Sequence, residues 1–253
     1  MATEQERRER LEIDFWTNSA TESPGARSLD AFTNKMSEAR VVLEKFETYG
    51  EIFGSASHVL ELGGGQGWVS CMLARMFPAI EQIVASDISS AAVASLPEWE
   101  RVFDVKITDS FACPSYDIPV ANESFDVVFA FAAAHHFGAH RRTLHELARV
   151  LRPGGRALYL HEPACRDFVY ERALKRVNRK RPVVQEDLLR VQRMNDLAKD
   201  AGLQVQRIAA PTTTYRAPLE TIYYLVLQKV PPLRSLLPCS VDFIFTKDDR
   251  ELV

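Results

Sequence analysis

Glycines cluster in a short segment that lies between an apolar run and a helical pattern. The segment begins at Glu61 and contains Gly63, Gly64, Gly65 and Gly67. Glycine permits positive φ angles and lets a ligand approach the backbone without a Cβ in the way. The helical pattern that follows offers free N–H groups in its first turn. We therefore interpret this segment as a ligand-binding turn.

The spacing of these glycines disfavours two common phosphate-binding motifs. The dinucleotide motif GxGxxG needs a glycine at position 68 or 70, where the chain has Trp68 and Ser70. The P-loop ends in Gly-Lys-Ser or Gly-Lys-Thr, and the segment lacks this ending. Asp87 ends the next apolar run, 20 residues after Gly67. Dinucleotide sites also place an acid there, so Asp87 alone leaves the ligand open.

Two histidines follow a near-continuous apolar run. His135 and His136 are the candidate catalytic residues, because imidazole titrates near neutral pH and can take a proton from an acceptor hydroxyl. His161 and Glu162 end a later strand pattern, where substrate could also lie. The histidines within residues 135–145 lack a supporting carboxylate pattern, so no metal site is predicted.

Alternating strand and helix patterns position these groups. Strands are predicted at 58–62, 83–86, 102–107, 125–132, 156–160, 203–209 and 241–246. A helical face lies between the first two, because apolar residues of 69–77 recur at i, i+3, i+4, i+7 and i+8. The alternation predicts an α/β fold with a doubly wound, mostly parallel, seven-stranded sheet and helices on both faces. Ligands of such sheets bind at the carboxyl ends of the strands, where the glycine segment falls.

The chain is predicted to form one domain, residues 1–253, with three parts. Residues 1–55 form an N-terminal helical cap or lid, 56–163 the ligand-binding core, and 164–253 insert helices and C-terminal strands. Phe15, Trp16 and Phe32 of the first part are expected to pack over the acceptor pocket.

Composition excludes several other classes of protein. The 253 residues are 46% hydrophobic and 26% charged, as in an average globular protein rather than a disordered one. The net charge of −3 provides no overall positive field for nucleic acid. The four cysteines form no CxxC pair, and no run of 18 apolar residues could span a membrane. We expect a cytoplasmic protein, a monomer or homodimer, that binds no nucleic acid.

Five motifs occur in a characteristic order. They are VLELGGGQGWVS, ASDIS, ITDS, IPVANESFDVVFAFAAAHHF and RVLRPGGRALYLHEP. Together they resemble the class I S-adenosylmethionine-dependent methyltransferases, in particular the small-molecule, methyltransferase type 11-like subgroup. The resemblance covers about residues 55–165 and implies a Rossmann-like fold.

The resemblance also implies the cofactor, S-adenosyl-L-methionine, and its product, S-adenosyl-L-homocysteine. The glycine segment would surround the amino acid and ribose portions of the cofactor. Glu61 would orient this segment or contact the amino group of the cofactor. Asp87 would accept hydrogen bonds from the ribose hydroxyls, and Asp109 would accept one from the adenine amino group. Phe131 would lie near the sulfonium. The expected cofactor-binding residues are Glu61, Gly63, Gly64, Gly65, Gly67, Asp87, Ile88, Asp109, Ser110, Phe111, Ala130 and Phe131.

The function predicted from these features is methyl transfer to an O, N or C atom of a small-molecule metabolite. One alternative is an RNA or protein methyltransferase that uses the basic run 172–181, which could instead hold an acidic acceptor or be a solvated face. Another is a scaffold subunit that binds the cofactor without catalysis. An NAD-dependent oxidoreductase is disfavoured by the glycine spacing. The apolar segment 222–227 is expected to be core, pocket wall or dimer face.

Overall fold

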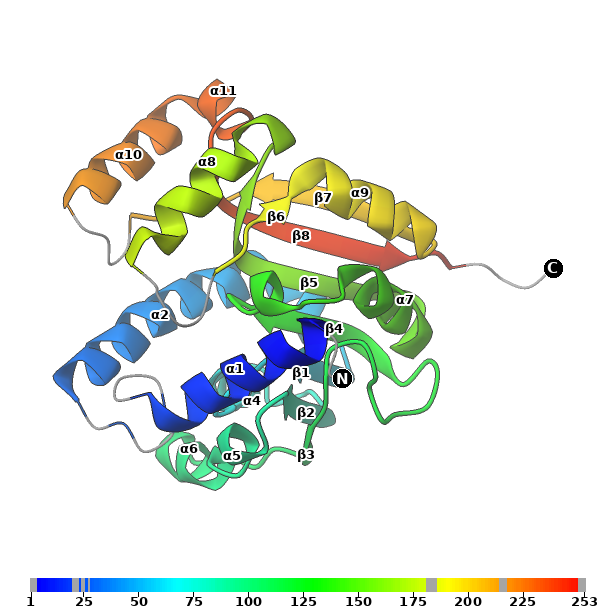
Figure 1. Ribbon diagram of the computed structural model, residues 1–253. Helices are drawn as coiled ribbons and strands as arrows, with labels where there is room; N and C mark the ends of the chain where they lie inside the picture. Colours follow the sequence, from blue (N-terminus) through cyan, green and yellow to red (C-terminus); the bar gives the residue numbers. More distant parts are fainter. Residues whose placement is uncertain are drawn as a thin grey trace.

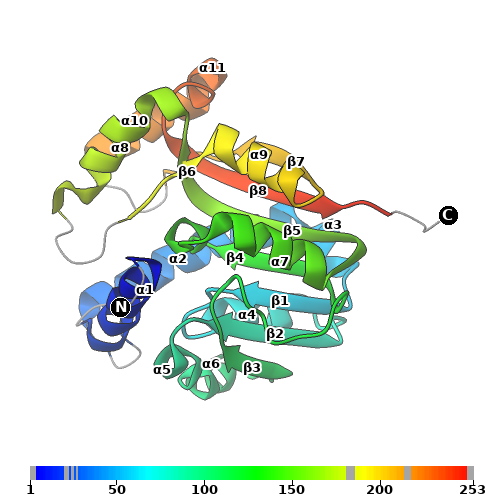
Figure 2. The ribbon, with the colours of Figure 1, turned by 45° about the vertical axis from the view of Figure 1, so that its right-hand side comes forward.

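The computed structural model describes residues 4–19, 23, 26, 28–180, 186–213 and 218–249. Its strands form one sheet in the order β3-β2-β1-β4-β5-β8-β7, with β6 paired to β5. The strands are β1 (His58–Leu62), β2 (Gln82–Asp87), β3 (Asp109–Ala112), β4 (Phe125–Phe131), β5 (Leu151–Cys165), β6 (Leu189–Arg190), β7 (Leu203–Ala209) and β8 (Cys239–Lys247). Figure 2 shows the sheet running from β3 at the bottom through β1 and β4 to β8 near the top.

The sheet is mostly parallel. Strand β1 pairs in parallel with both β2 and β4, and the outer pairs β2/β3 and β4/β5 are parallel too. Only β8 runs antiparallel to its neighbours β5 and β7 among the described residues. Because the chain order reverses beside β1, the crevice for a ligand lies at the carboxyl ends of β1 and β4. The predicted fold class is confirmed.

The helices surround this sheet (Figure 1). They are α1 (Glu4–Asn18), α2 (Leu29–Thr48), α3 (Gly50–Gly54), α4 (Trp68–Met76), α5 (Ser90–Val93), α6 (Leu96–Phe103), α7 (His140–Val150), α8 (Asp167–Val177), α9 (Val191–Asp200), α10 (Pro218–Lys229) and α11 (Pro231–Arg234). Two 3₁₀ turns are η1 (Ala134–His136) and η2 (Asn178–Lys180). No helix in the described part of the chain is long and apolar enough to cross a membrane.

Each face of the sheet has its own apolar core. Val127 and Phe129 of β4 pack with α2 and α4, whereas Val128 and Ala130 pack with α7 and α9. This division follows from the alternation of side chains along a strand. The second half of α2 belongs to the first core through Val42 and Phe46, so much of the N-terminal region supports the sheet.

The third strand differs from its prediction at 102–107. Val102 lies in α6, which ends where Asp104 adopts a left-handed conformation with φ 52°. The apolar side chains of Val105 and Ile107 that suggested a strand instead pack under the sheet from a loop. Strand β3 therefore begins at Asp109. This shift matters for the site, because it changes which residues end the strand.

Candidate active site

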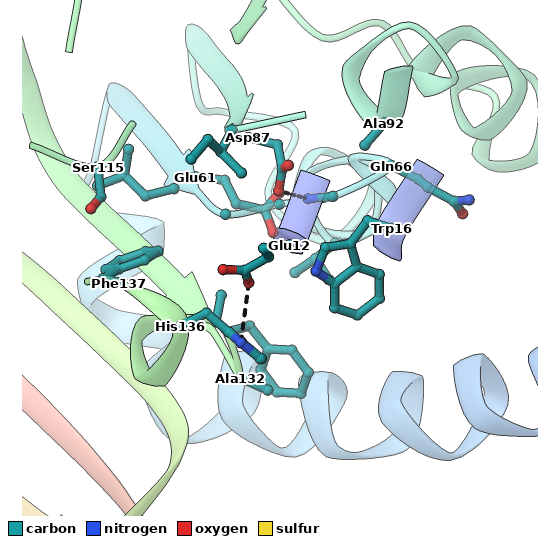
Figure 3. A pocket seen from close by; sticks show the side chains of 18 of the residues that line it. Glu12, Trp16, Glu61, Gln66, Asp87, Ala92, Ser115, Ala132, His136 and Phe137 are labelled. Atoms are coloured by element: carbon teal, nitrogen blue, oxygen red, sulfur yellow. Dashed lines mark hydrogen bonds and ion pairs between the residues drawn. The ribbon is translucent and has the colours of Figure 1, made fainter. Parts of the chain in front are cut away.

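A cavity opens at the carboxyl ends of β1, β2 and β4, and α1 forms one wall of it (Figure 3). Its volume is roughly 1270 Å³ with its open mouth included. Among its lining residues are Glu9, Glu12, Trp16, Lys35, Glu38, Gln66, Cys113, Ser115, Tyr116, Ala132 and Phe137. Of the residues predicted from sequence, Glu61, Gly63, Gly64, Gly65, Asp87, Ile88, Phe131 and His136 also line it.

The glycine turn has the backbone conformation that glycine favours. Gly63, Gly65 and Gly67 have φ angles of 68°, 55° and 77°. A Cβ on Gly65 would meet nothing within 4 Å, whereas a Cβ on Gly67 would lie 2.5 Å from Leu96 Cδ1. Gly65 thus leaves open space beside the backbone for a ligand, and Gly67 allows α4 to begin close to α6.

Asp87 closes the turn from the neighbouring strand. Its carboxylate accepts hydrogen bonds from the N–H groups of Gly65 and Ser89, both at 2.8 Å. Burial raises the pKa of Asp87, while these backbone hydrogen bonds lower it. The side chain also faces the cavity, so it can accept further hydrogen bonds from a ligand.

Glu61 is buried beneath the turn. Ser70 donates a hydrogen bond to its carboxylate, and Ser86 donates one of 2.8 Å to its backbone carbonyl. Burial raises the pKa of Glu61 to about 7, against the hydrogen bonds from Ser70. Glu61 therefore links β1 to α4 and β2 and has a polar edge on the cavity.

The opposite wall has a carboxylate–imidazole pair. Glu12 Oε1 of α1 lies 3.1 Å from His136 Nδ1 of η1, and both side chains are mostly buried. Trp16 stands beside them, with its ring edge-on to His136 at 6.3 Å (Figure 3). Burial raises the pKa of Glu12 to about 7, and a hydrogen bond from Trp16 opposes this. A carboxyl group with a pKa near neutrality is suited to proton transfer.

A tyrosine attaches α1 to the sheet. The hydroxyl of Tyr116, in the loop after β3, donates to the Glu9 carboxylate at 3.0 Å. The Arg142 guanidinium stacks over the Tyr116 ring at 3.9 Å from its centroid. Glu9, Glu12 and Trp16 share one helical face at i, i+3 and i+7, and this face forms the wall of the cavity.

His135 lies behind this wall rather than in it. Its Nδ1 lies 2.8 Å from Glu162 Oε2, and its Nε2 lies 2.8 Å from Glu186 Oε2. Glu162 also accepts the backbone N–H groups of residues 133, 134 and 135 at 2.8–3.1 Å. The buried carboxylate at the end of β5 thereby fixes η1 and with it the orientation of His136.

Several residues that were predicted to belong to the site lie outside the cavity. Of the described residues, those predicted as site residues that do not line it are Gly67, Asp109, Ser110, Phe111, Ala130 and His135. Asp109 is exposed at the start of β3, and the strand ends at Ala112 beside Asp87. Cys113 and Ser115 therefore stand where Asp109 and Ser110 were expected. Ala130 faces the opposite core, because alternate residues of β4 point to opposite faces.

Other predictions about flanking segments also change. Phe32 is 62% exposed and does not cover the cavity, whereas Trp16 does. Of the basic run, Arg181 lies outside the described residues, and none of the described residues 172–180 lines the cavity. In the segment 222–227, Leu227 is buried, but Ile222 and Leu225 are exposed.

Four residues in or beside the site were not predicted from the sequence: Glu12, Gln66, Tyr116 and Glu186. For Glu12 a signal existed, because Glu9, Glu12 and Trp16 recur with helical spacing. Glu186 follows an undescribed segment, and nothing in its neighbourhood in sequence marks it. The fold of the chain after α8 brings Glu186 Oε2 to 2.8 Å from His135 Nε2.

The fold and the site together are typical of α/β proteins that bind a nucleoside cofactor. The sheet order, the glycine turn after β1 and the acid at the end of β2 suit a ligand with a ribose. The open space beside Gly65 provides the close backbone approach that such a ligand needs.

Comparison with known proteins finds a methyltransferase domain within the chain. Residues 60–159 match the family model described as a methyltransferase domain. The chain is 29% identical over 126 residues to the uncharacterized methyltransferase YcgJ of Bacillus subtilis, covering 49% of this chain and 47% of that protein. It is 30% identical over 106 residues to a malonyl-[acyl-carrier protein] O-methyltransferase of Hahella chejuensis, covering 42% and 36%. The sequence likeness is thus to methyltransferases, and the matches span less than half the length of these relatives.

Solved structures share the fold over nearly the whole chain. Geranyl diphosphate C-methyltransferase from Streptomyces coelicolor aligns with a TM-score of 0.69 at 13% identity, covering 97% of this chain and 98% of that one. The crystal structure of YcgJ aligns with a TM-score of 0.61 at 17% identity, covering 84% and 100%. At these identities the likeness establishes the fold.

Proposed function

We propose that the protein transfers a methyl group from S-adenosylmethionine to an oxygen, nitrogen or carbon atom of a small-molecule acceptor. One observation supports this most directly. A single cavity has the glycine turn with Asp87 on one wall and the Glu12–His136 pair on the other. Relatives named as methyltransferases of malonyl-[acyl-carrier protein] and of 27-O-demethylrifamycin SV agree with a non-nucleic-acid acceptor.

The first wall contains the glycine turn and Asp87, and it would hold the cofactor. We call it the cofactor wall. When bound, S-adenosylmethionine supplies an electrophilic sulfonium methyl group and leaves as S-adenosylhomocysteine. Asp87 would accept hydrogen bonds from the ribose hydroxyls, while Gly65 allows close contact with the backbone. The buried carboxyl of Glu61 supports the turn and offers a polar edge for the amino acid portion.

The second wall contains Glu12 and His136, and it would orient the acceptor and receive its proton. We call it the acceptor wall. Glu12 and His136 share a close contact at 3.1 Å, so a proton taken from an acceptor hydroxyl or amine can be held between them. Trp16 and Phe137 cover the apolar part of this wall and exclude water. The protein would thus contribute mainly positioning and proton transfer. His135 would act indirectly, by fixing the turn that carries His136.

Calorimetric titration with S-adenosylmethionine and with NAD tests this proposal. We expect the wild type to bind S-adenosylmethionine and not NAD. Asp87→Asn should weaken that binding about a hundredfold, because hydrogen bonds to a charged acceptor are lost. Asp109→Asn is the matched control, since Asp109 is exposed and outside the cavity, and should bind as the wild type does.

The proposal is overturned if the folded wild type binds no S-adenosylmethionine, alone or with candidate acceptors. Equal losses in Asp87→Asn and Asp109→Asn would also contradict the assignment of the binding wall.

A further inference from the structure

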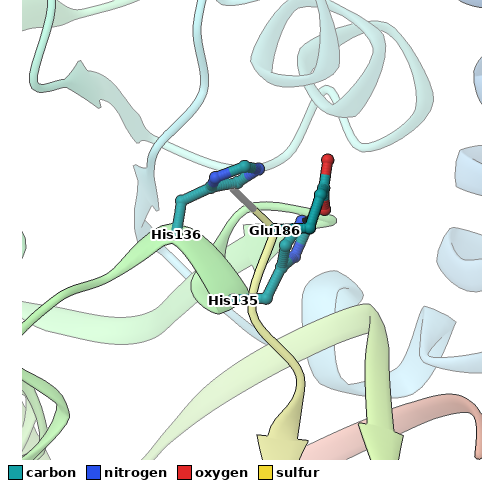
Figure 4. Close-up of side chains that lie close together, drawn as sticks. All are labelled: His135, His136 and Glu186. Carbon is teal, nitrogen blue, oxygen red and sulfur yellow. Dashed lines mark ion pairs between the residues drawn. The ribbon is translucent and has the colours of Figure 1, made fainter. Parts of the chain in front are cut away.

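A second group of polar side chains adjoins the acceptor wall. His135, His136 and Glu186 each place one potential ligand atom so that all three lie within 4.8 Å of one another (Figure 4). The side chains are 7%, 15% and 13% exposed. They come from η1 and from the segment before β6, which the fold brings together. Two imidazoles and a carboxylate at this separation can share one ion.

The surroundings of His135 favour a cation at its outer nitrogen. Glu162 already accepts three backbone N–H groups and lies 2.8 Å from His135 Nδ1. A carboxylate in this position fixes Nδ1 as the protonated nitrogen and directs Nε2 outwards. Nε2 then faces a second carboxylate, Glu186, at 2.8 Å. The nitrogen and the carboxylate oxygen are close enough to ligate one cation side by side.

We propose that His135 Nε2, His136 and Glu186 bind a divalent transition-metal ion. Histidines that bind metals almost always donate their other ring N–H to a carboxylate or carbonyl, and Glu162 fills this role for His135. Imidazole with carboxylate suits Zn²⁺ and its first-row neighbours, whereas Mg²⁺ and Ca²⁺ prefer oxygen ligands alone. The ion belongs to the Zn²⁺-like class.

The location of the ion gives it a role at the acceptor. His136 and Glu12 line the cavity, so an ion held by His136 lies at the cavity edge. Three protein ligands leave a coordination position for water or for an acceptor oxygen. An acceptor oxygen bound there would become more acidic, and Glu12 would remain as the group that takes its proton. This role depends on the proposed methyl transfer, whereas binding of the ion does not.

Metal binding by the purified full-length chain tests the inference directly. The protein is treated with a chelator and titrated calorimetrically with Zn²⁺, and with Mg²⁺ for comparison. Co²⁺ serves as the spectroscopic probe, because imidazole and carboxylate ligands give it visible absorption bands. We expect one Zn²⁺ per chain, Co²⁺ bands that Zn²⁺ displaces, and much weaker binding of Mg²⁺.

Two substitutions of ligands and one matched control locate the ion. Glu186→Gln and His136→Asn should each weaken Zn²⁺ binding by about tenfold to a hundredfold or more. His145→Asn removes a histidine that also pairs with a carboxylate, Asp200 at 3.0 Å, but on the exposed side of α7. Its Zn²⁺ affinity should equal that of the wild type. Both ligand variants leave the Glu162–His135 pair intact, so the fold should survive.

The inference is overturned if the folded wild type binds no Zn²⁺ or Co²⁺. It is also overturned if Glu186→Gln and His136→Asn bind Zn²⁺ as tightly as His145→Asn does, because the ion then lies elsewhere. The experiment contains neither cofactor nor acceptor. A failure here therefore leaves the proposed methyl transfer standing, and a failure to bind S-adenosylmethionine leaves the metal measurement interpretable.

Discussion

The two walls of the cavity are built in different ways. The cofactor wall depends on backbone conformation: three glycines with positive φ, and N–H groups that donate to Asp87 and to the carbonyl of Ser86. The acceptor wall depends on side chains from distant segments, joined by pairs such as Glu12–His136 and His135–Glu162. The first wall is set by local geometry, and the second by titratable contacts.

This difference predicts how each wall responds to change. Backbone geometry is insensitive to pH but intolerant of added side-chain atoms at particular positions. Carboxylate–imidazole pairs tolerate small changes in shape but respond to protonation and to the loss of one partner. Substitutions in each wall and changes of pH should therefore affect the two walls differently.

Removal of Glu162 should have the largest effect. Glu162→Ala leaves the His135 ring and three backbone N–H groups of η1 without their buried acceptor. We expect the free energy of unfolding to fall by about 3–5 kcal/mol, measured by urea denaturation. Asp200→Ala is the control, because its pair with His145 is exposed, and should cost under about 1 kcal/mol. Equal losses in both variants would contradict the anchoring role.

The acceptor wall should make the stability of the protein depend on pH, through the buried carboxyl of Glu12. The pKa of Glu12 is about 7 in the folded protein against an ordinary value of 4.5, so the folded state binds its proton more tightly. The wild type's stability relative to Glu12→Gln should be greatest below pH 4.5. It should fall as the pH rises to 7, by up to about 3 kcal/mol.

Denaturation of wild type and Glu12→Gln across this pH range gives the difference directly. Contributions from Glu61 are present in both proteins and largely cancel. A difference that stays flat, or that grows with pH, would contradict the buried position of Glu12.

Alanine at two glycines should affect the cofactor wall in contrasting ways. Both positions have positive φ, which costs about 1 kcal/mol for alanine. Gly67→Ala also places its Cβ 2.5 Å from Leu96, so its total loss of unfolding free energy should be nearer 2 kcal/mol. A Cβ on Gly65 would meet no protein atom within 4 Å. Gly65→Ala should therefore destabilise the protein less than Gly67→Ala does, but it should weaken S-adenosylmethionine binding more.

Denaturation and calorimetric titration of the two glycine variants measure both quantities. The contrast fails if Gly65→Ala binds S-adenosylmethionine as the wild type does, or if Gly67→Ala is the more stable of the two.

The cofactor wall was largely predictable from sequence, because its signals are local. Glycines 63–67 sit directly after a strand, and Asp87 ends the next one, so a correct strand assignment places both. The strand predicted just before Asp109 was wrong, because the local apolar signal there misled. Apolar residues at 102–107 pack from a helix end and a loop, and the strand that they suggested begins later, at Asp109.

The acceptor wall was predictable only in part. His136 was identified because it lies a few residues after β4, but its neighbour His135 lies behind the wall. Nothing near Glu12 or Glu186 in the sequence shows that each contacts a histidine of η1. These contacts arise when α1 packs across the strand ends and the chain after α8 returns beside η1.

From the sequence alone one could place most strands and helices, the glycine turn after β1, and Asp87 at the end of β2. Each depends on neighbouring residues whose types restrict the backbone or repeat with a helical or strand period. Tertiary structure alone decided which residues end β3, which face of β4 lines the cavity, and which carboxylates meet the histidines. These features depend on burial and on contacts between distant segments, and packing sets both only when the whole sheet forms.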